Sequence, residues 1–152
     1  MAKAVRAWMG LLGTALAGSV MAAAPTVATE DVVDKIESPW DMAFMKDGTM
    51  FFTEKCKGLS VRLPSGAINK LHGLGGTSGY ASTSADLFCD GQAGMMGVAI
   101  DPQFASNRFL YVYSSSNLGG KLGNRVIQRQ HVGGPAHRRL IRKGGSGVWG
   151  AD

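Results

Sequence analysis

The sequence predicts an all-β protein built from β-propeller blades, on three observations. The 152 residues include 22 glycines and only 18% charged residues, a composition that suits short strands and many turns. Turn residues separate short apolar runs, as at Asp47-Gly48, where glycine supplies the positive φ of a tight hairpin. A unit of strand, polar turn and aromatic-rich strand returns after about 55 residues, and such a repeat of four-strand units is typical of a propeller.

The first unit is expected to be a four-strand antiparallel meander. Its strands are predicted at residues 41–45, 49–54, 59–63 and 67–71, with turns at 46–48 and 64–66. Residues 31–36 are a candidate edge or closing strand before it. Residues 73–84 are polar and rich in glycine, without periodicity, and are expected to form a loop.

The second unit is expected to begin after this loop and to remain incomplete. Its strands are predicted at residues 96–100, 109–114 and 124–128, and strand periodicity ends at Arg129. The expected organisation is therefore a signal peptide at 1–22, about one and a half blades within 31–128, and an irregular basic tail at 129–152. A truncated or frame-altered end explains the tail best, with a basic interaction tail as the alternative.

Residues 1–22 have the layout of a secretory signal peptide. Lys3 and Arg6 precede a short apolar stretch at residues 7–17, and cleavage is expected after Ala22 or Ala23. The apolar stretch is too short and too rich in glycine to cross a membrane comfortably. We therefore expect a periplasmic or secreted protein without a stable membrane span.

The net charge of +5 lies in the two ends of the chain. The only charges in residues 1–22 are two bases, and residues 124–152 carry six bases and one acid, whereas residues 23–123 are slightly acidic. No basic stripe alternates with stacking aromatic residues, so the sequence argues against nucleic-acid binding.

The chain contains two cysteines, Cys56 and Cys89. In an exported protein they favour a disulfide, which we expect to tie the end of one strand in the first unit to the start of the next unit. Zinc or redox roles are not expected, because there is no Cys-x-x-Cys pair and His72, His131 and His137 lack the spacing of metal ligands. No metal ligand is assigned within the chain.

Gly91, Gly94 and Gly97 recur at every third position around Gln92. A dinucleotide-binding loop needs Gly-x-Gly-x-x-Gly at the start of a helix, and a Walker loop needs Gly-Lys-Ser or Gly-Lys-Thr; neither is present. Two interpretations of Gln92 stay open. It is a loop glutamine that bonds nearby backbone, which spacing alone favours, or a side chain whose amide donor and acceptor suit sugar hydroxyls.

Several motifs occur in a fixed order: Ser38-Pro39-Trp40-Asp41-Met42-Ala43-Phe44, Asp47-Gly48, Phe52-Thr53-Glu54, Gly91-Gln92-Ala93-Gly94-Met95-Met96-Gly97-Val98-Ala99, Asp101-Pro102-Gln103-Phe104 and Asn107-Arg108-Phe109-Leu110-Tyr111-Val112-Tyr113. Together they resemble the amino-terminal part of the pyrroloquinoline-quinone (PQQ)-dependent soluble sugar dehydrogenases, the glucose/sorbosone dehydrogenase family. The resemblance runs from about Ile36 to Ile127, some three-fifths of the chain.

The resemblance implies a six-bladed β-propeller with PQQ and Ca²⁺ on its top face. It implies oxidation of an aldose or a related alcohol by hydride transfer to the quinone, followed by an electron acceptor, while a histidine removes the hydroxyl proton. Gln92 occupies the place of the family's substrate-facing glutamine. His137 lies in a stretch similar to the one that holds the family's base, but Arg138 and Arg139 replace the small residues expected there.

The family's calcium ligands, its cofactor-binding arginine and its later blades lie further along than the resemblance extends. We expect this chain to be an inactive, weakly stable fragment, because one and a half blades leave sheet edges unpaired and bury little apolar surface. A non-enzymatic exported propeller that binds a partner is the alternative function.

Overall fold

The computed structural model describes residues 23–117, 120–132 and 139–141, and nearly all of its regular structure is strand. The chain divides into two units, Met1–Val32 and Val33–Asp152. In the first unit, residues 23–32 are described, and they form neither helix nor strand. Within the described ranges, no helix combines the length and the apolar character that crossing a membrane requires.

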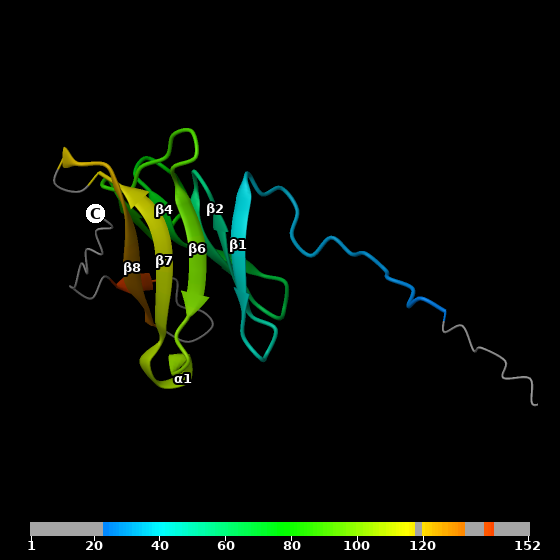
Figure 1. The fold of residues 1–152 in the computed structure, drawn as a ribbon. Helices are drawn as coiled ribbons and strands as arrows, with labels where there is room; N and C mark the ends of the chain where they lie inside the picture. Colours follow the sequence, from blue (N-terminus) through cyan, green and yellow to red (C-terminus); the bar gives the residue numbers. More distant parts are fainter. Residues whose placement is uncertain (1–22, 118–119, 133–138, 142–152) are drawn as a thin grey trace, which may run out of the picture. The chain divides into compact units, whose positions relative to one another are not determined.

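The first sheet is a four-strand antiparallel meander with one added parallel strand (Figure 1). Its strands follow one another in sequence order: β1 (Pro39–Phe44), β2 (Met50–Glu54), β3 (Gly58–Arg62), β4 (Ile68–Leu74) and β5 (Ser82–Ser84). The hairpin between β1 and β2 turns at Asp47-Gly48, as predicted. Gly48 has a φ of 85°, and the Asp47 carboxylate accepts the amide of Thr49 at 2.9 Å.

Two local features of this sheet differ from the prediction. β5 lies inside the segment that was predicted to be a loop, because it pairs in parallel with the end of β4. Residues 33–36, part of the candidate edge strand, form no strand, and Val33 and Lys35 are bends. Lys35 and Ser38 have φ values of 55° and 48°, which interrupt an extended chain.

The second sheet contains β6 (Met95–Ile100), β7 (Phe109–Ser116), β8 (Gly123–Val132) and β9 (Arg139–Ile141), also in sequence order. The short helix α1 (Phe104–Asn107) joins β6 to β7 (Figure 1). β8 and β9 extend regular structure into residues 129–152, which we expected to be irregular. The reason for the longer β8 is its pairing with β7, in which Phe109 faces Gln130.

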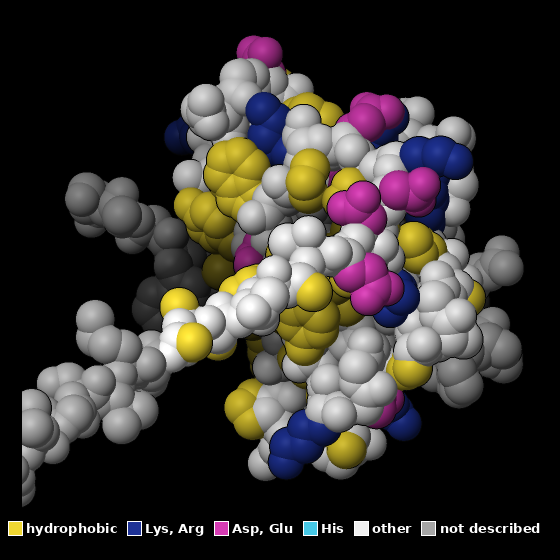
Figure 2. Space-filling view, turned by 90° about the vertical axis from the view of Figure 1, so that its right-hand side faces the viewer, with side chains coloured by type: hydrophobic (Ala, Val, Ile, Leu, Met, Phe, Trp, Pro, Cys, Tyr) yellow, Lys and Arg dark blue, Asp and Glu magenta, His cyan; other side chains and the backbone are white. Residues whose placement is uncertain are grey.

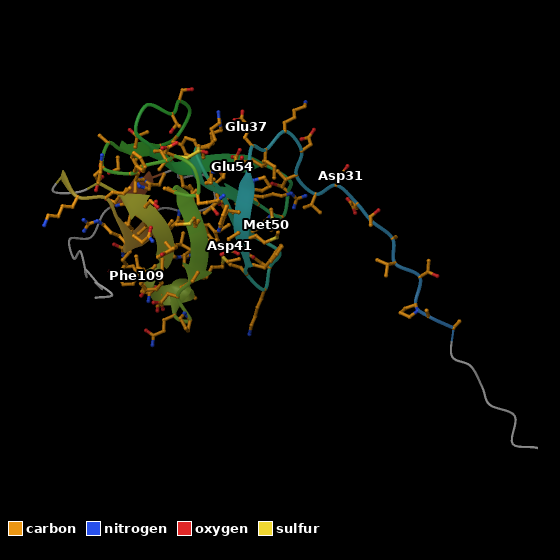
Figure 3. All side chains as sticks on the ribbon, turned by 45° about the horizontal axis from the view of Figure 1, so that its top comes forward. Asp31, Glu37, Asp41, Met50, Glu54 and Phe109 are labelled. Atoms are coloured by element: carbon orange, nitrogen blue, oxygen red, sulfur yellow. A yellow bond between two sulfur atoms is a disulfide. The ribbon has the colours of Figure 1, made fainter. Side chains whose placement is uncertain are left out.

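The two sheets pack against each other around one apolar core. Its buried side chains come from both sheets: Phe51, Leu59, Val61, Leu71, Leu74, Leu87, Met95, Val98, Phe104, Leu110 and Val112. Polar contacts also join β6 to the first sheet. Asp41, labelled in Figure 3, accepts the amide of Val98 at 2.9 Å, and the Thr53 hydroxyl donates to the carbonyl of Met96 at 2.5 Å.

The other face of the first sheet carries exposed apolar side chains. Figure 2 shows the side on which β1 lies, and hydrophobic side chains are exposed there between charged ones. Trp40, Met42 and Phe44 of β1 are 48%, 59% and 62% exposed. The first sheet is therefore apolar on both faces, as a blade between two neighbours would be.

Candidate functional site

Gln92 lies in a tight turn between Cys89 and β6. The Ala93 amide donates to the carbonyl of Asp90 at 2.7 Å, which closes the turn, and Gly91 has a φ of 50°, a value that favours glycine. The Gln92 side chain is exposed, and it makes no hydrogen bond to any residue within the described ranges. Its amide donor and acceptor are both open to a ligand.

β7 supports this turn from the second sheet. The carbonyl of Gly94 accepts the amide of Ser115 at 2.9 Å and the hydroxyl of Ser114 at 3.2 Å. Before the turn, the Phe88 amide donates to the carbonyl of Ser115 at 3.1 Å. Both serines are buried, so these bonds are shielded from water.

The connection between β2 and β3 supports the same turn from the first sheet. The Lys55 ammonium donates to the carbonyl of Gly91 at 2.5 Å, and the Lys55 carbonyl accepts the amide of Met95 at 2.8 Å. Gly94 approaches Lys55 very closely. A Cβ atom on Gly94 would lie 2.5 Å from Lys55 Cγ and 2.6 Å from the Lys55 carbonyl oxygen.

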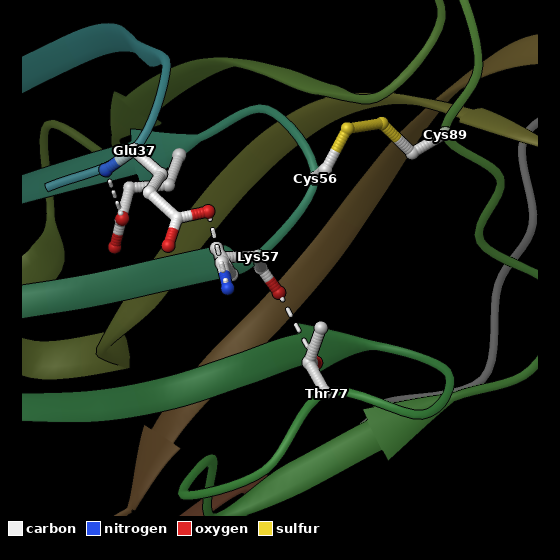
Figure 4. A network of polar contacts seen from close by, with 6 residues as sticks. Glu37, Cys56, Lys57, Thr77 and Cys89 are labelled. Carbon is white, nitrogen blue, oxygen red and sulfur yellow. Dashed lines mark hydrogen bonds and ion pairs between the residues drawn. A yellow bond between two sulfur atoms is a disulfide. The ribbon is translucent and has the colours of Figure 1, made fainter.

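The predicted disulfide lies beside these contacts. Cys56, the residue after Lys55, is bonded to Cys89, which precedes the Gln92 turn (Figure 4). A covalent bond and a set of hydrogen bonds therefore attach the Gln92 turn to the first sheet, in addition to the bonds from β7.

Further contacts fix the connection between β2 and β3 itself. Lys57 Nζ lies 3.2 Å from Glu37 Oε2, and the Lys57 carbonyl accepts the hydroxyl of Thr77 at 3.3 Å (Figure 4). The Glu37 amide donates to the buried carboxylate of Glu54 at 2.7 Å; both residues are labelled in Figure 3. These contacts tie the connection to the segment before β1 and to the loop after β4.

Of the two described histidines, His72 is buried and His131 is partly buried. Arg129 Nη2 donates to His72 Nε2 at 2.7 Å, and since arginine cannot accept, His72 Nδ1 carries the proton and donates to Ser82 Oγ at 3.1 Å. Burial, and then the Arg129 charge, lower the pKa of His72 to about 3, against an opposing effect of Asp86. Burial, and then Arg108, also lower the pKa of His131. Both rings are neutral at pH 7.

His137, the sequence-predicted base, lies outside the described residues. Within those residues, no group of three or more His, Cys, Asp and Glu side chains could hold a metal ion. Lys55 was missed by the sequence analysis. It belongs to no motif for binding or catalysis, and its contact with a residue 36 positions away is a feature of the fold alone.

Comparison with known proteins places these features in one family. The family model described as glucose/sorbosone dehydrogenase matches residues 36–140. The aldose sugar dehydrogenase YliI of Escherichia coli is 30% identical over 112 residues, which cover 73% of this chain and 28% of that protein.

Solved structures agree with the fold. A crystal structure of an oxidoreductase from Thermus thermophilus, described as a glucose dehydrogenase, has a TM-score of 0.57 at 28% identity and covers 75% of this chain and 30% of that one. The PQQ-bound aldose sugar dehydrogenase of Streptomyces coelicolor has a TM-score of 0.54 at 19% identity, covering 68% and 27%. The likeness confirms the β-propeller fold class. This chain spans between a quarter and a third of the length of each relative.

Proposed function

Because this chain belongs to the glucose/sorbosone dehydrogenase family, we propose that it is part of an enzyme that oxidises an aldose or a related alcohol with PQQ as the hydride acceptor. The observation that carries the proposal is the Gln92 turn. An exposed amide on a turn attached to two sheets is a preorganised group for binding polar ligands. The resemblance implies that Gln92 corresponds to the family's substrate-facing glutamine.

In this proposal Gln92 orients the sugar. Its NH₂ group donates to one hydroxyl oxygen and its carbonyl accepts from another hydroxyl, and together these bonds hold the sugar in the site. PQQ, when bound, supplies an electrophilic site for the hydride. The hydroxyl proton goes to a base, which we propose is His137, so the sugar loses one hydride and one proton in a two-electron oxidation. No step is assigned to Ca²⁺, because the family's calcium ligands lie further along than the resemblance extends.

We also propose that the protein is exported to the periplasm or secreted. The signal-like residues 1–22 suggest export, and the disulfide between Cys56 and Cys89 supports it, because disulfides persist in oxidising compartments.

A non-enzymatic propeller that binds a sugar or another polar partner is the second candidate function. This function needs only a group that binds a polar ligand, and the described residues provide one in the exposed amide of Gln92. The two candidates differ in whether the bound sugar is oxidised.

The test uses the full-length protein that contains this sequence, purified after export and checked by mass spectrometry for a mature end after Ala22 or Ala23. PQQ, Ca²⁺, an aldose and a dye acceptor are added, and we expect dye reduction. Gln92→Ala is expected to raise KM for the aldose about tenfold, because hydrogen bonds to the hydroxyls are lost. Gln103→Ala, at another exposed glutamine, serves as the matched control and keeps the parent KM.

The remaining outcomes of this test would each contradict one part of the proposal. Sugar binding without dye reduction would contradict the enzyme and favour the binding module. An unchanged KM in Gln92→Ala would remove Gln92 from the sugar site. The 152-residue chain alone is expected to be inactive, and dye reduction by it would overturn that expectation.

A further inference from the structure

Lys55 contacts the Gln92 turn on both sides of Gln92. Before Gln92, the Lys55 ammonium donates to the carbonyl of Gly91 at 2.5 Å. After it, the Lys55 carbonyl accepts the amide of Met95 at 2.8 Å, and the Lys55 stem lies against Gly94. One residue of the first sheet therefore holds both ends of the short segment that carries the amide.

Lys55 is itself fixed, unlike a lysine on an open surface. Its own amide donates to the carbonyl of Ser38 at 3.0 Å, and the next residue, Cys56, is bonded to Cys89. The Lys55 side chain is half-buried. Because its backbone and stem are already held, less conformational freedom is lost when its ammonium reaches Gly91.

The carbonyl of Gly91 belongs to the peptide plane that leads into Gln92. Gly91 has a φ of 50°, and glycine adopts many combinations of backbone angles, so its own conformational preference does not fix this plane. A hydrogen bond from a charged donor does fix it, because rotation of the plane would carry the oxygen away from the ammonium. The direction in which the Gln92 side chain leaves the backbone depends on this plane.

We propose that Lys55 is a positioning residue that fixes the Gly91–Gln92 peptide and so directs the Gln92 amide towards the hydroxyl groups of a bound sugar. The part that concerns the sugar rests on the proposed function, and the part that concerns the turn rests on the contacts alone. Lys55 acts through Gln92, because its ammonium is engaged by the Gly91 carbonyl.

The first test compares variants of the full-length protein at Lys55. Lys55→Met keeps an unbranched stem against Gly94 and removes the donor, so we expect KM for the aldose to rise about tenfold while kcat changes less than about twofold. Lys55→Arg restores a charged donor and is expected to recover KM to within about threefold of the parent. Lys46→Met is the matched control, because Lys46 is exposed in the hairpin between β1 and β2 and its side chain makes no hydrogen bond or ion pair with any described residue.

The second test is a double-mutant cycle with Gln92. If Lys55 acts by directing the Gln92 amide, Lys55→Met has no further effect on KM once Gln92 is alanine. Equal effects of Lys55→Met in both backgrounds would overturn the positioning role, since a merely structural role would act on both.

The third test needs no sugar and no cofactor. Hydrogen exchange measured by mass spectrometry follows the amides of Ala93 and Met95, which donate to Asp90 and Lys55. We expect them to exchange at least about fivefold faster in Lys55→Met and at the parent rate in Lys46→Met. Unchanged exchange in Lys55→Met would overturn the inference. A parent protein that oxidises no sugar would instead contradict the proposed function, and the exchange rates would still decide whether Lys55 holds the turn.

Discussion

At the scale of single residues, the three glycines around Gln92 differ in what they contribute. Gly91 has a positive φ with open space around it, so only its backbone conformation favours glycine there. Gly94 is required by space, because Lys55 fills the position of a side chain there. At Gly97 a Cβ atom would lie 3.5 Å from Tyr113 Cβ, an ordinary contact distance. The regular spacing of the three therefore does not reflect one shared role.

This difference predicts the effect of adding one methyl group. Gly94→Ala is expected to lower the free energy of unfolding by about 2 kcal/mol, because the new Cβ would overlap Lys55 Cγ and the Lys55 carbonyl oxygen. Gly97→Ala is the matched control and is expected to change stability by less than about 0.5 kcal/mol. Urea denaturation of the parent and both variants measures the effect, and equal losses in the two variants would contradict the close approach at Gly94.

The sequence led to the prediction of Gln92 as a site residue, but it could not predict the contacts that support the Gln92 turn. The resemblance to a family singled out Gln92, and the count of two cysteines predicted the disulfide. Nothing in the sequence relates Lys55 to Gly91, because the contact exists only after two sheets have packed together. A further reason is that lysines are common on protein surfaces and carry no motif by themselves.

At the scale of the elements, local signals predicted the hairpins and missed the parallel strand. The turn at Asp47-Gly48 is set by neighbouring residues, and so is the turn before β4, where Gly66 has a φ of 87°. β5 has three residues and pairs with β4 in parallel, so too few positions exist to show a period of two. Its position depends instead on partners such as His72, which faces Ser82.

The disulfide is the covalent link between the β2–β3 connection and the segment before β6. Replacing both cysteines, as Cys56→Ser with Cys89→Ser, is expected to lower the free energy of unfolding by about 3.5 kcal/mol, because the unfolded chain regains the freedom of a closed loop. The sequence separation of 33 sets this value. Reductant should lower the stability of the parent by a similar amount and leave the variant unchanged. Superimposable urea curves for parent and variant would refute a stabilising role.

At the scale of the whole molecule, a network of polar groups, with Arg129 and His72 buried, accompanies the apolar core between the sheets. It runs from Arg129 of β8 to His72 of β4, then to Ser82 of β5, whose hydroxyl donates to the carbonyl of Leu71 at 3.3 Å. Arg129 and His72 are 5% and 3% exposed. This network of hydrogen bonds requires a neutral His72, because a protonated ring has no lone pair to accept from Arg129.

This requirement makes the packing of the two sheets sensitive to acid. The folded-state pKa of His72, about 3, lies below the ordinary value of 6.5, so the unfolded chain binds more protons between these two values. The contribution of His72 to the free energy of unfolding is therefore fully present above pH 6.5. It falls as the pH drops, with a slope that approaches about 1.4 kcal/mol per pH unit. Between pH 6.5 and 4.5 we expect the parent to lose about 2 kcal/mol more than His72→Gln, whose amide can accept from Arg129 and does not titrate.

Urea denaturation of the two proteins at several pH values measures this difference. His131, whose pKa is also lowered, and Asp86, which opposes the shift at His72, are present in both proteins, so their contributions cancel in the comparison. Parallel pH profiles would show that His72 stays as easily protonated in the folded protein as in the unfolded chain. That result would contradict a buried hydrogen bond from Arg129 to a neutral His72, and therefore also the polar link between the two sheets.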